Sequence, residues 1–152
     1  MTYKPEGYQD VIPNMMFKNA KEAASYYEVA LGAKNVQLMT DAKGWVMHGE
    51  MWVGDSCLFF GEEIEWFPRK APTQPGSVAF YIYVPDVDAA YKRAVDAGMT
   101  SGSAPETMFW GDRTAVVTDK YHYSWTFSTH VEDVSEDEMA KRQKAFEESM
   151  KG

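Results

Sequence analysis

The chain has 152 residues, of which 45% are hydrophobic and 14% aromatic, and its formal net charge is −8. This length allows one domain with a hydrophobic core, and the acidic charge excludes a nucleic-acid backbone from the expected partners. The opening MTYKPEGYQD contains no apolar segment, and no run reaches the roughly 18 apolar residues of a membrane span, so we expect a cytoplasmic protein without a membrane partner.

The first predicted elements follow a polar arm that extends to Tyr8 and has no need to be ordered. A strand is predicted over 11–17. A helix begins after Asn19, which forms a capping box with Glu22, and the helix ends at Gly32.

Three short strands come next, joined by polar turns. They are predicted at 36–40, 45–53 and 56–60. The connection that follows, about 62–76, contains three prolines, three glutamates and the adjacent aromatic residues Trp66 and Phe67. These two aromatic residues either cover one end of the core or form a lid over a ligand.

The second half of the chain repeats the strand and helix of the first. Alternation over 77–84 gives two apolar faces, so this strand should be covered on both sides. Asp86 caps the next helix and Gly98 ends it. Further strands are predicted at 107–110, 113–118 and 123–129. A terminal helix over about 135–150 has a thin apolar stripe, which indicates a position on the surface of the domain or against a partner subunit.

The two halves therefore look like a tandem repeat, because Gly32 and Gly98 occupy equivalent positions. Each repeat has the order βαβββ. We expect one α+β domain over 1–152 with modules at about 10–61 and 77–131, followed by a C-terminal helix.

Four segments in this order resemble one known group of proteins. They are MHGEMWVGDSCLFF, YVPDVDAAYKRAVDAG, FWGDR and HVEDVSEDEMAKR. The chain is similar to the vicinal oxygen chelate superfamily, which contains glyoxalase I, bleomycin resistance proteins and extradiol dioxygenases, and within it to the demethylubiquinone-methyltransferase-like subgroup. The resemblance implies that the modules form a cup-shaped mixed sheet, and that members dimerise with ligand sites in the cups.

Metal-dependent members of this superfamily place a His or Glu on the first and last strand of each module. The equivalent positions here are Ile12, Phe59, Ala79 and Thr126, and only Thr126 carries even a weak ligand. We therefore expect no metal site and no other cofactor, and we lean against enzymatic activity.

His48 and Glu50 are the polar candidates on the strand over 45–53, where alternation puts them on one face with Val46 and Trp52 and turns Met47 toward the helices. One interpretation has them hold a cationic ligand or transfer a proton. The other has Glu50 form an ion pair within the sheet, for instance with Arg113.

Three further residues have specific expectations. Arg113 either binds an anionic or carbonyl group or forms an ion pair with Glu50 or Asp112. His122 stands where the subgroup has glycine, so this turn is either reshaped or strained. Cys57, the single cysteine, cannot form an intramolecular disulfide, fits a reducing compartment, and is expected to be buried and inert.

These observations favour a binding protein that holds a small aromatic or cationic molecule in an aromatic cup, as bleomycin resistance proteins do. The expected partners are this ligand and a second copy of the chain. The alternatives are a metal-dependent lyase, isomerase or dioxygenase, and a dimeric scaffold or regulatory protein without a ligand. The expected ligand-binding residues are His48, Glu50, Trp52, Phe59, Trp66, Tyr81, Trp110, Arg113 and Thr126.

Overall fold

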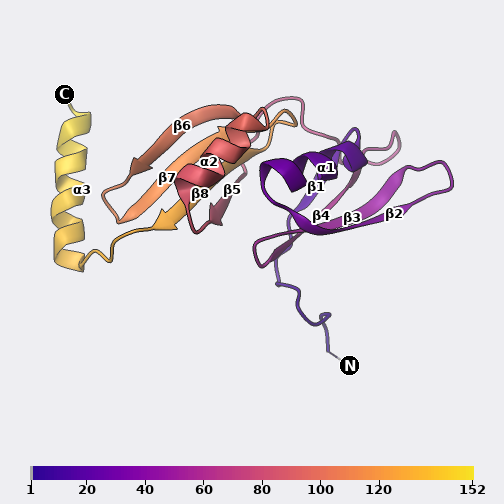
Figure 1. Cartoon of the computed structure of the whole chain (residues 1–152), viewed down its shortest axis with the longest axis horizontal. Helices are drawn as coiled ribbons and strands as arrows, with labels where there is room; N and C mark the ends of the chain where they lie inside the picture. Colours follow the sequence, from indigo (N-terminus) through magenta and orange to yellow (C-terminus); the bar gives the residue numbers. More distant parts are fainter. Residues whose placement is uncertain (1) are drawn as a thin grey trace. The chain divides into compact units, whose positions relative to one another are not determined.

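The computed structural model describes residues 2–152 and contains three helices and eight strands in two repeats (Figure 1). The chain divides into a first unit, which runs up to Gly76 and includes Lys120–His122, and a second unit, Ser77–Asp119 with Tyr123–Gly152. The order of elements is β1 (Asn14–Phe17), α1 (Ala20–Ala30), β2 (Lys34–Thr40), β3 (Val46–Val53), β4 (Ser56–Glu62), β5 (Ala79–Tyr83), α2 (Val87–Asp96), β6 (Thr100–Thr107), β7 (Asp112–Thr118), β8 (Ser124–His130) and α3 (Glu136–Met150). The predicted α+β fold of two βαβββ repeats with a C-terminal helix is confirmed.

The first unit contains a four-stranded sheet in the order β1-β4-β3-β2. Strand β1 runs parallel to β4, and the other neighbours are antiparallel. Helix α1 covers one face of this sheet (Figure 1). It begins as the sequence predicts, because the Asn19 side chain accepts a hydrogen bond of 3.0 Å from the Glu22 amide.

The core of the first unit lies between α1 and the sheet. Tyr27 from the helix and Phe17 and Phe60 from the strands are almost fully buried there. Gly49 of β3 makes room for this packing, since a Cβ atom at that position would lie 2.3 Å from the Phe60 ring. Glycine is therefore required by the close approach of the ring rather than by a turn.

Strand β3 departs from simple alternation at its start. The pairing with β2 shifts between Met39 and Thr40, so that Met39 faces His48 while Thr40 faces Val46. An extra residue in one strand of this kind reverses the side-chain direction. Val46 is consequently buried and Met47 is 52% exposed, which is the opposite of the predicted arrangement.

The second unit repeats this plan, with strand order β5-β8-β7-β6 and α2 packed on one face. The Asp86 side chain accepts a hydrogen bond from the Ala89 amide and so caps α2 as predicted. Trp125 is the largest buried side chain, and its ring stacks on Phe80 at 4.5 Å. Its indole N–H donates a hydrogen bond of 2.8 Å to Asp119.

The prediction of a strand over 107–110 is wrong. Strand β6 occupies Thr100–Thr107, and the following residues form a turn in which the Gly111 amide donates to the Met108 carbonyl. The sequence TSGSAPET has weak strand propensity, and Pro105 falls in a register shift between β6 and β7. Such a sequence is tolerated because β6 is the edge of its sheet.

The expectation that the strand over 77–84 is covered on both faces is also wrong. Tyr81 and Tyr83 are 52% and 66% exposed, because α2 packs on the face formed with buried Trp125 and Phe127. The other face of this sheet is open within the described unit.

Helix α3 has no buried residue over Glu136–Met150, as its thin apolar stripe indicates. Arg142 ties it to the preceding loop through two hydrogen bonds of 2.8 Å with Glu132, and the Phe146 ring lies 5.2 Å from that of Phe109. Among residues 2–152, none of the helices combines the length and the apolar character that crossing a bilayer requires.

The segment Lys120–His122 belongs to the first unit. The Tyr121 ring packs edge-on against Phe17 at 5.1 Å, and Lys120 forms an ion pair with Glu22. His122 has a φ of +72°, a conformation that favours glycine, so of the two expectations for this turn the backbone agrees with strain.

Candidate functional site

The open face of the first sheet carries the polar candidates of β3. Gly49 and Met51 are buried toward α1, so His48, Glu50 and Trp52 lie on the opposite face. Phe59 of β4 joins them, because it is paired directly with Glu50.

These side chains contact one another. His48 Nε2 lies 3.2 Å from Glu50 Oε1, and the His48 ring meets the Phe59 ring edge-on at 4.7 Å. The sheet thus presents an imidazole, a carboxylate and an aromatic ring side by side.

The N-terminal arm covers part of this group. The Tyr8 hydroxyl donates a hydrogen bond of 2.7 Å to Glu50 Oε2, and the Tyr8 ring lies 5.9 Å from that of Trp52 and 6.0 Å from that of Phe59. We call Glu50, Trp52 and Phe59 the Tyr8 subsite. The sequence offers no reason to expect a fixed position for Tyr8. Its position is set by these contacts with β3 and β4.

The next arm residue is fixed to the backbone of β4. The Gln9 side-chain amide donates a hydrogen bond of 2.5 Å to the Cys57 carbonyl, and its oxygen accepts one of 3.2 Å from the Cys57 amide. The hydrogen bond to Glu50 raises the pKa of Tyr8, with burial adding to the effect. Tyr8 therefore remains a neutral donor at neutral pH. Burial raises the pKa of the Cys57 thiol to about 11, so this thiol is protonated.

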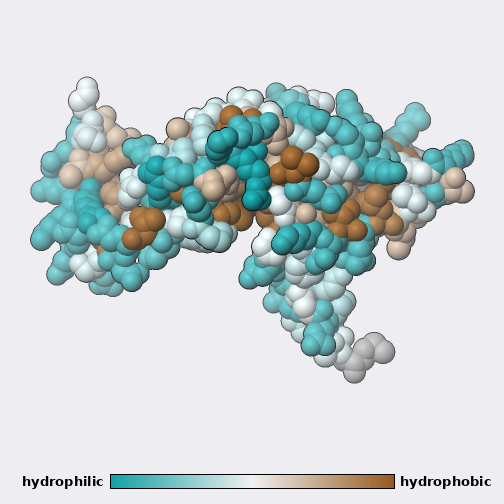
Figure 2. Space-filling view, viewed as in Figure 1, coloured by the Kyte–Doolittle hydropathy of each residue, from teal (hydrophilic) through white to brown (hydrophobic). Residues whose placement is uncertain are grey.

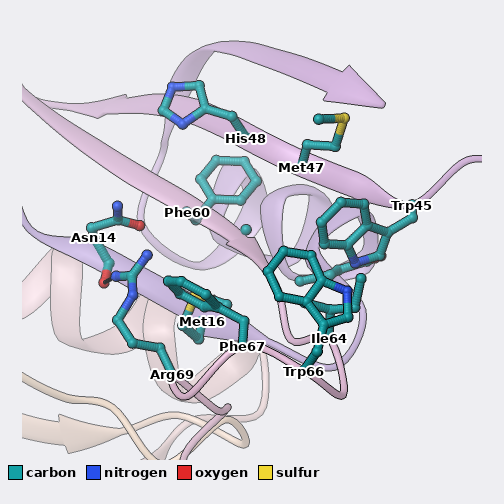
Figure 3. A pocket seen from close by; sticks show the side chains of 12 residues that line it. Asn14, Met16, Trp45, Met47, His48, Phe60, Ile64, Trp66, Phe67 and Arg69 are labelled. Atoms are coloured by element: carbon teal, nitrogen blue, oxygen red, sulfur yellow. Dashed lines mark hydrogen bonds between the residues drawn. The ribbon is translucent and has the colours of Figure 1, made fainter. Parts of the chain in front are cut away.

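Beside His48 the same face is hollowed by a cavity of about 220 Å³ (Figure 3). We call it the Trp66 pocket. Trp45, Met47 and His48 line one side of it, and the loop after β4 closes the other. The complete lining is Asn14, Met16, Trp45, Met47, His48, Phe60, Gly61, Glu62, Ile64, Trp66, Phe67 and Arg69.

Trp66 and Phe67 form the loop side of this pocket. Their rings are nearly perpendicular with centroids 6.1 Å apart, and the Arg69 guanidinium lies 5.5 Å from the Phe67 ring. Trp66 is 77% exposed. Most of its ring is therefore outside the core, and it lies along the edge of the Trp66 pocket (Figure 3).

The second unit contains the other four candidates. Tyr81 and Thr126 are paired neighbours on the open face of the second sheet. Arg113 shares the face of buried Ala115 and Val117, where α2 packs, and Trp110 lies in the turn before β7.

Arg113 forms an ion pair with a residue that the sequence did not indicate. Its guanidinium donates two hydrogen bonds, of 2.8 and 2.9 Å, to the carboxylate of Asp88 on α2. Asp88 lies in the first turn of α2, two residues after its cap, and so reaches the start of β7. Glu50 is bonded to Tyr8 and His48.

The profile of the Glyoxalase/Bleomycin resistance protein/Dioxygenase superfamily matches residues 14–127. The chain belongs to this superfamily. Its curated relatives include uncharacterized proteins of Mycobacterium tuberculosis and Mycobacterium bovis. Each is 27% identical over 132 residues, which is 84% of this chain and 78% and 87% of the respective relative.

Several solved structures share the fold of this chain. TioX from Micromonospora sp. ML1 has a TM-score of 0.64 and 17% identity, over 84% of this chain and 100% of that one. A glyoxalase-related enzyme from Clostridium phytofermentans has a TM-score of 0.61 and 16% identity, with the same shares of the two chains. These likenesses establish the fold alone.

The described side chains offer no ligand set for the divalent metal ion that catalytic members of the glyoxalase superfamily use. Within residues 2–152 no three His, Cys, Asp or Glu side chains gather as metal ligands. Of the positions where the superfamily pattern puts ligands, Phe59 is in the Tyr8 subsite, and Ala79 and Thr126 are on β5 and β8.

One cluster escaped the sequence interpretation. His130 Nδ1 lies 2.8 Å from Asp112 Oδ1, and its Nε2 lies 2.8 Å from Asp133. The Tyr83 hydroxyl donates a 3.2 Å hydrogen bond to Asp112 Oδ2. Burial alone would raise the pKa of Asp112, but the hydrogen bonds from His130 and Tyr83 hold it below its usual value. The sequence could have indicated this cluster only through the pairing of Asp112 with His130 across β7 and β8. The predicted strand begins at residue 113 and therefore leaves Asp112 out.

Proposed function

We propose that this protein binds a small aromatic molecule, preferably a cationic one, in the Trp66 pocket and holds it without a metal ion. The observation that carries the proposal is the arrangement of four aromatic residues around one cavity on the open face of the first sheet. Trp45, Phe60, Trp66 and Phe67 line it together with His48 (Figure 3).

The composition of the pocket supports a planar ligand. Aromatic rings offer faces and edges to a bound ring, and Met16 and Met47 can adapt to its outline. The 77% exposure of Trp66 leaves a large apolar surface uncovered, which a stacked ligand would cover.

Charge supports a preference for cations. The Glu50 carboxylate lies 3.2 Å from His48, which lines the pocket, and so brings a negative charge close to it. The chain also has a formal net charge of −8. The one guanidinium that lines the pocket, Arg69, lies over the Phe67 ring and donates to the Asn14 carbonyl at 3.4 Å. A ring with a positive charge is thus attracted both by the aromatic faces and by the field of the chain.

Two finer expectations belong to this proposal. The segment FWGDR supports membership of the demethylubiquinone-methyltransferase-like subgroup, and the exposed face with Tyr81 and Tyr83 supports a homodimer. Sedimentation analysis of the purified protein tests the dimer. A mass equal to one chain would contradict it.

The binding proposal is tested with 9-aminoacridine, a planar cation, and 9-anthracenecarboxylate, a planar anion of similar size. We expect the cation to bind more tightly, and Trp66→Ala to weaken its binding about tenfold through the lost ring contact. Val29→Ala is the control, because Val29 is 66% exposed on α1, which covers the opposite face of the first sheet, and it should leave the affinity unchanged.

Three results would contradict the proposal. They are unchanged affinity in Trp66→Ala, equal affinity for the anion, and a stoichiometric divalent ion in the purified protein. Fluorescence titration gives the first two, and elemental analysis gives the third.

A further inference from the structure

The N-terminal arm places an aromatic ring on a surface with the chemistry of a ligand site. Tyr8 contacts Trp52 and Phe59 through its ring and Glu50 through its hydroxyl. All three residues lie on the open face of the first sheet, next to His48 and the Trp66 pocket.

We propose that Tyr8 is an internal competitor for this subsite, and that the ligand class is an aromatic ring with a hydroxyl or amino hydrogen-bond donor. This inference rests on the proposed function and names both the chemistry of the ligand and its regulation. When such a ring occupies the Tyr8 subsite, the arm must leave it.

The pattern of hydrogen bonds defines this chemistry. Glu50 Oε1 is engaged by His48, while Oε2 accepts from the Tyr8 hydroxyl. A carboxylate oxygen at the end of an aromatic slot selects a donor rather than an acceptor. A phenol or an aromatic amine can supply the ring and the donor that Tyr8 now supplies.

The arm is held in a way that permits release of Tyr8. Gly7 has a φ of +88°, and the described residues before it bond to nearby parts of the arm. Lys4 forms an ion pair of 2.6 Å with Asp10, and the Tyr3 hydroxyl donates a hydrogen bond to the same carboxylate. Figure 1 shows this arm running away from the strands of the first unit, and Figure 2 shows a mostly hydrophilic surface over it.

Gln9 and Pro13, which follow Tyr8 in the chain, attach the arm to strand β4. Gln9 is bonded at both amide atoms to the backbone of Cys57, and the Pro13 carbonyl accepts a hydrogen bond of 2.9 Å from the Phe59 amide. Displacement of Tyr8 therefore breaks one side-chain hydrogen bond and two ring contacts without detaching the chain from β4. A cavity of about 560 Å³ between the arm and Glu50 and Phe59 gives the ring room to move.

The test measures the binding of 4-methylphenol to the full chain and to Tyr8→Ala by calorimetry. Removal of the competitor should tighten binding about tenfold, because the wild-type subsite is open in only a fraction of molecules. Tyr8→Phe, which keeps the ring but loses the hydroxyl, should give an intermediate affinity. In Tyr8→Ala, 4-methylanisole should bind much more weakly than 4-methylphenol, since its oxygen has no hydrogen to donate to Glu50.

Equal affinity of the wild type and Tyr8→Ala for 4-methylphenol would overturn the inference, as would equal affinity of Tyr8→Ala for the two probes. Near-ultraviolet circular dichroism of each variant shows that the unit is folded. The proposed function fails by a different readout, the response of 9-aminoacridine binding to Trp66→Ala, because Trp66 is not part of the Tyr8 subsite. The two failures are thus distinguishable.

Discussion

The Tyr8 hydroxyl donates a hydrogen bond of 2.7 Å to Glu50 Oε2, across 42 residues of sequence. Glu50 is the carboxylate that the sequence marks as a ligand group, so the chain itself engages that group. The pairing explains why Tyr8 is ordered although the arm around it is polar. It also shows that Tyr8 covers the Tyr8 subsite, while the Trp66 pocket beside it is open.

His122→Gly should stabilise the protein. His122 has a φ of +72°, a region in which a side chain is strained and glycine is not. We expect a gain of about 0.5 to 1 kcal/mol in the free energy of unfolding after the entropy cost of glycine is subtracted. Urea denaturation measures it. Asn35→Gly is the matched control and should gain less, because the short polar side chain of asparagine tolerates its φ of +53°. A loss of stability in His122→Gly would contradict the prediction.

Gly49→Ala should destabilise the first unit. The added Cβ would lie 2.3 Å from the Phe60 ring, which is buried between α1 and the sheet. We expect a loss of about 2 kcal/mol from the forced movement of this ring. Gly76→Ala meets no atom within 4 Å and should leave the free energy of unfolding nearly unchanged. Similar effects of the two substitutions would show that Phe60 does not approach Gly49 as described.

Stability should depend on pH through His130. Hydrogen bonds to Asp133 and Asp112 raise the pKa of His130 above 6.5, so its contribution is complete below that value and is lost as the pH rises through the raised pKa. The pKa of Asp112 is lowered below 3.8, so its contribution is lost only as the pH falls through that lowered value. The difference in melting temperature between wild type and His130→Ala should be largest near about pH 5 and narrow above about pH 8.

Asp133→Asn provides the control for this pH dependence. It removes the largest cause of the raised His130 pKa, so the loss of stabilisation should move to lower pH. A difference that instead grows with rising pH would mean that the imidazole is not held as a cation between the two carboxylates.

Cys57 should resist thiol reagents in the native protein. It is fully buried, and burial raises its pKa to about 11, so very little thiolate is present near neutral pH. We expect reaction with Ellman's reagent at the rate of unfolding, and immediate reaction in urea. Rapid modification of the native protein would contradict the burial of this thiol.

Much of the fold could be predicted because its signals are local. Asn19 and Asp86 each cap a helix through a hydrogen bond to an amide three residues further on. Gly32 and Gly98 have positive φ after those helices. Short-range geometry of this kind is contained in a few consecutive residues, so a repeat of it was visible without a structure.

The errors arose where distant pairing overrides local pattern. Strand β6 forms from a sequence of weak propensity because β7 lies beside it and supplies its hydrogen bonds. Met47 turns outward because one extra residue in β3 shifts the pairing with β2. Neither the partner strand nor the shift can be read from the residues themselves.

By itself, the sequence determined the repeat, the capped helices and the aromatic and acidic character of the candidate site, because these depend on residue type and close spacing. Only the tertiary structure decided which groups meet. It paired Glu50 with Tyr8 and Arg113 with Asp88, and it placed Trp66 at a pocket. Such pairings depend on how the chain folds back on itself over tens of residues, and a charge selects the complementary partner that folding brings within a few ångströms.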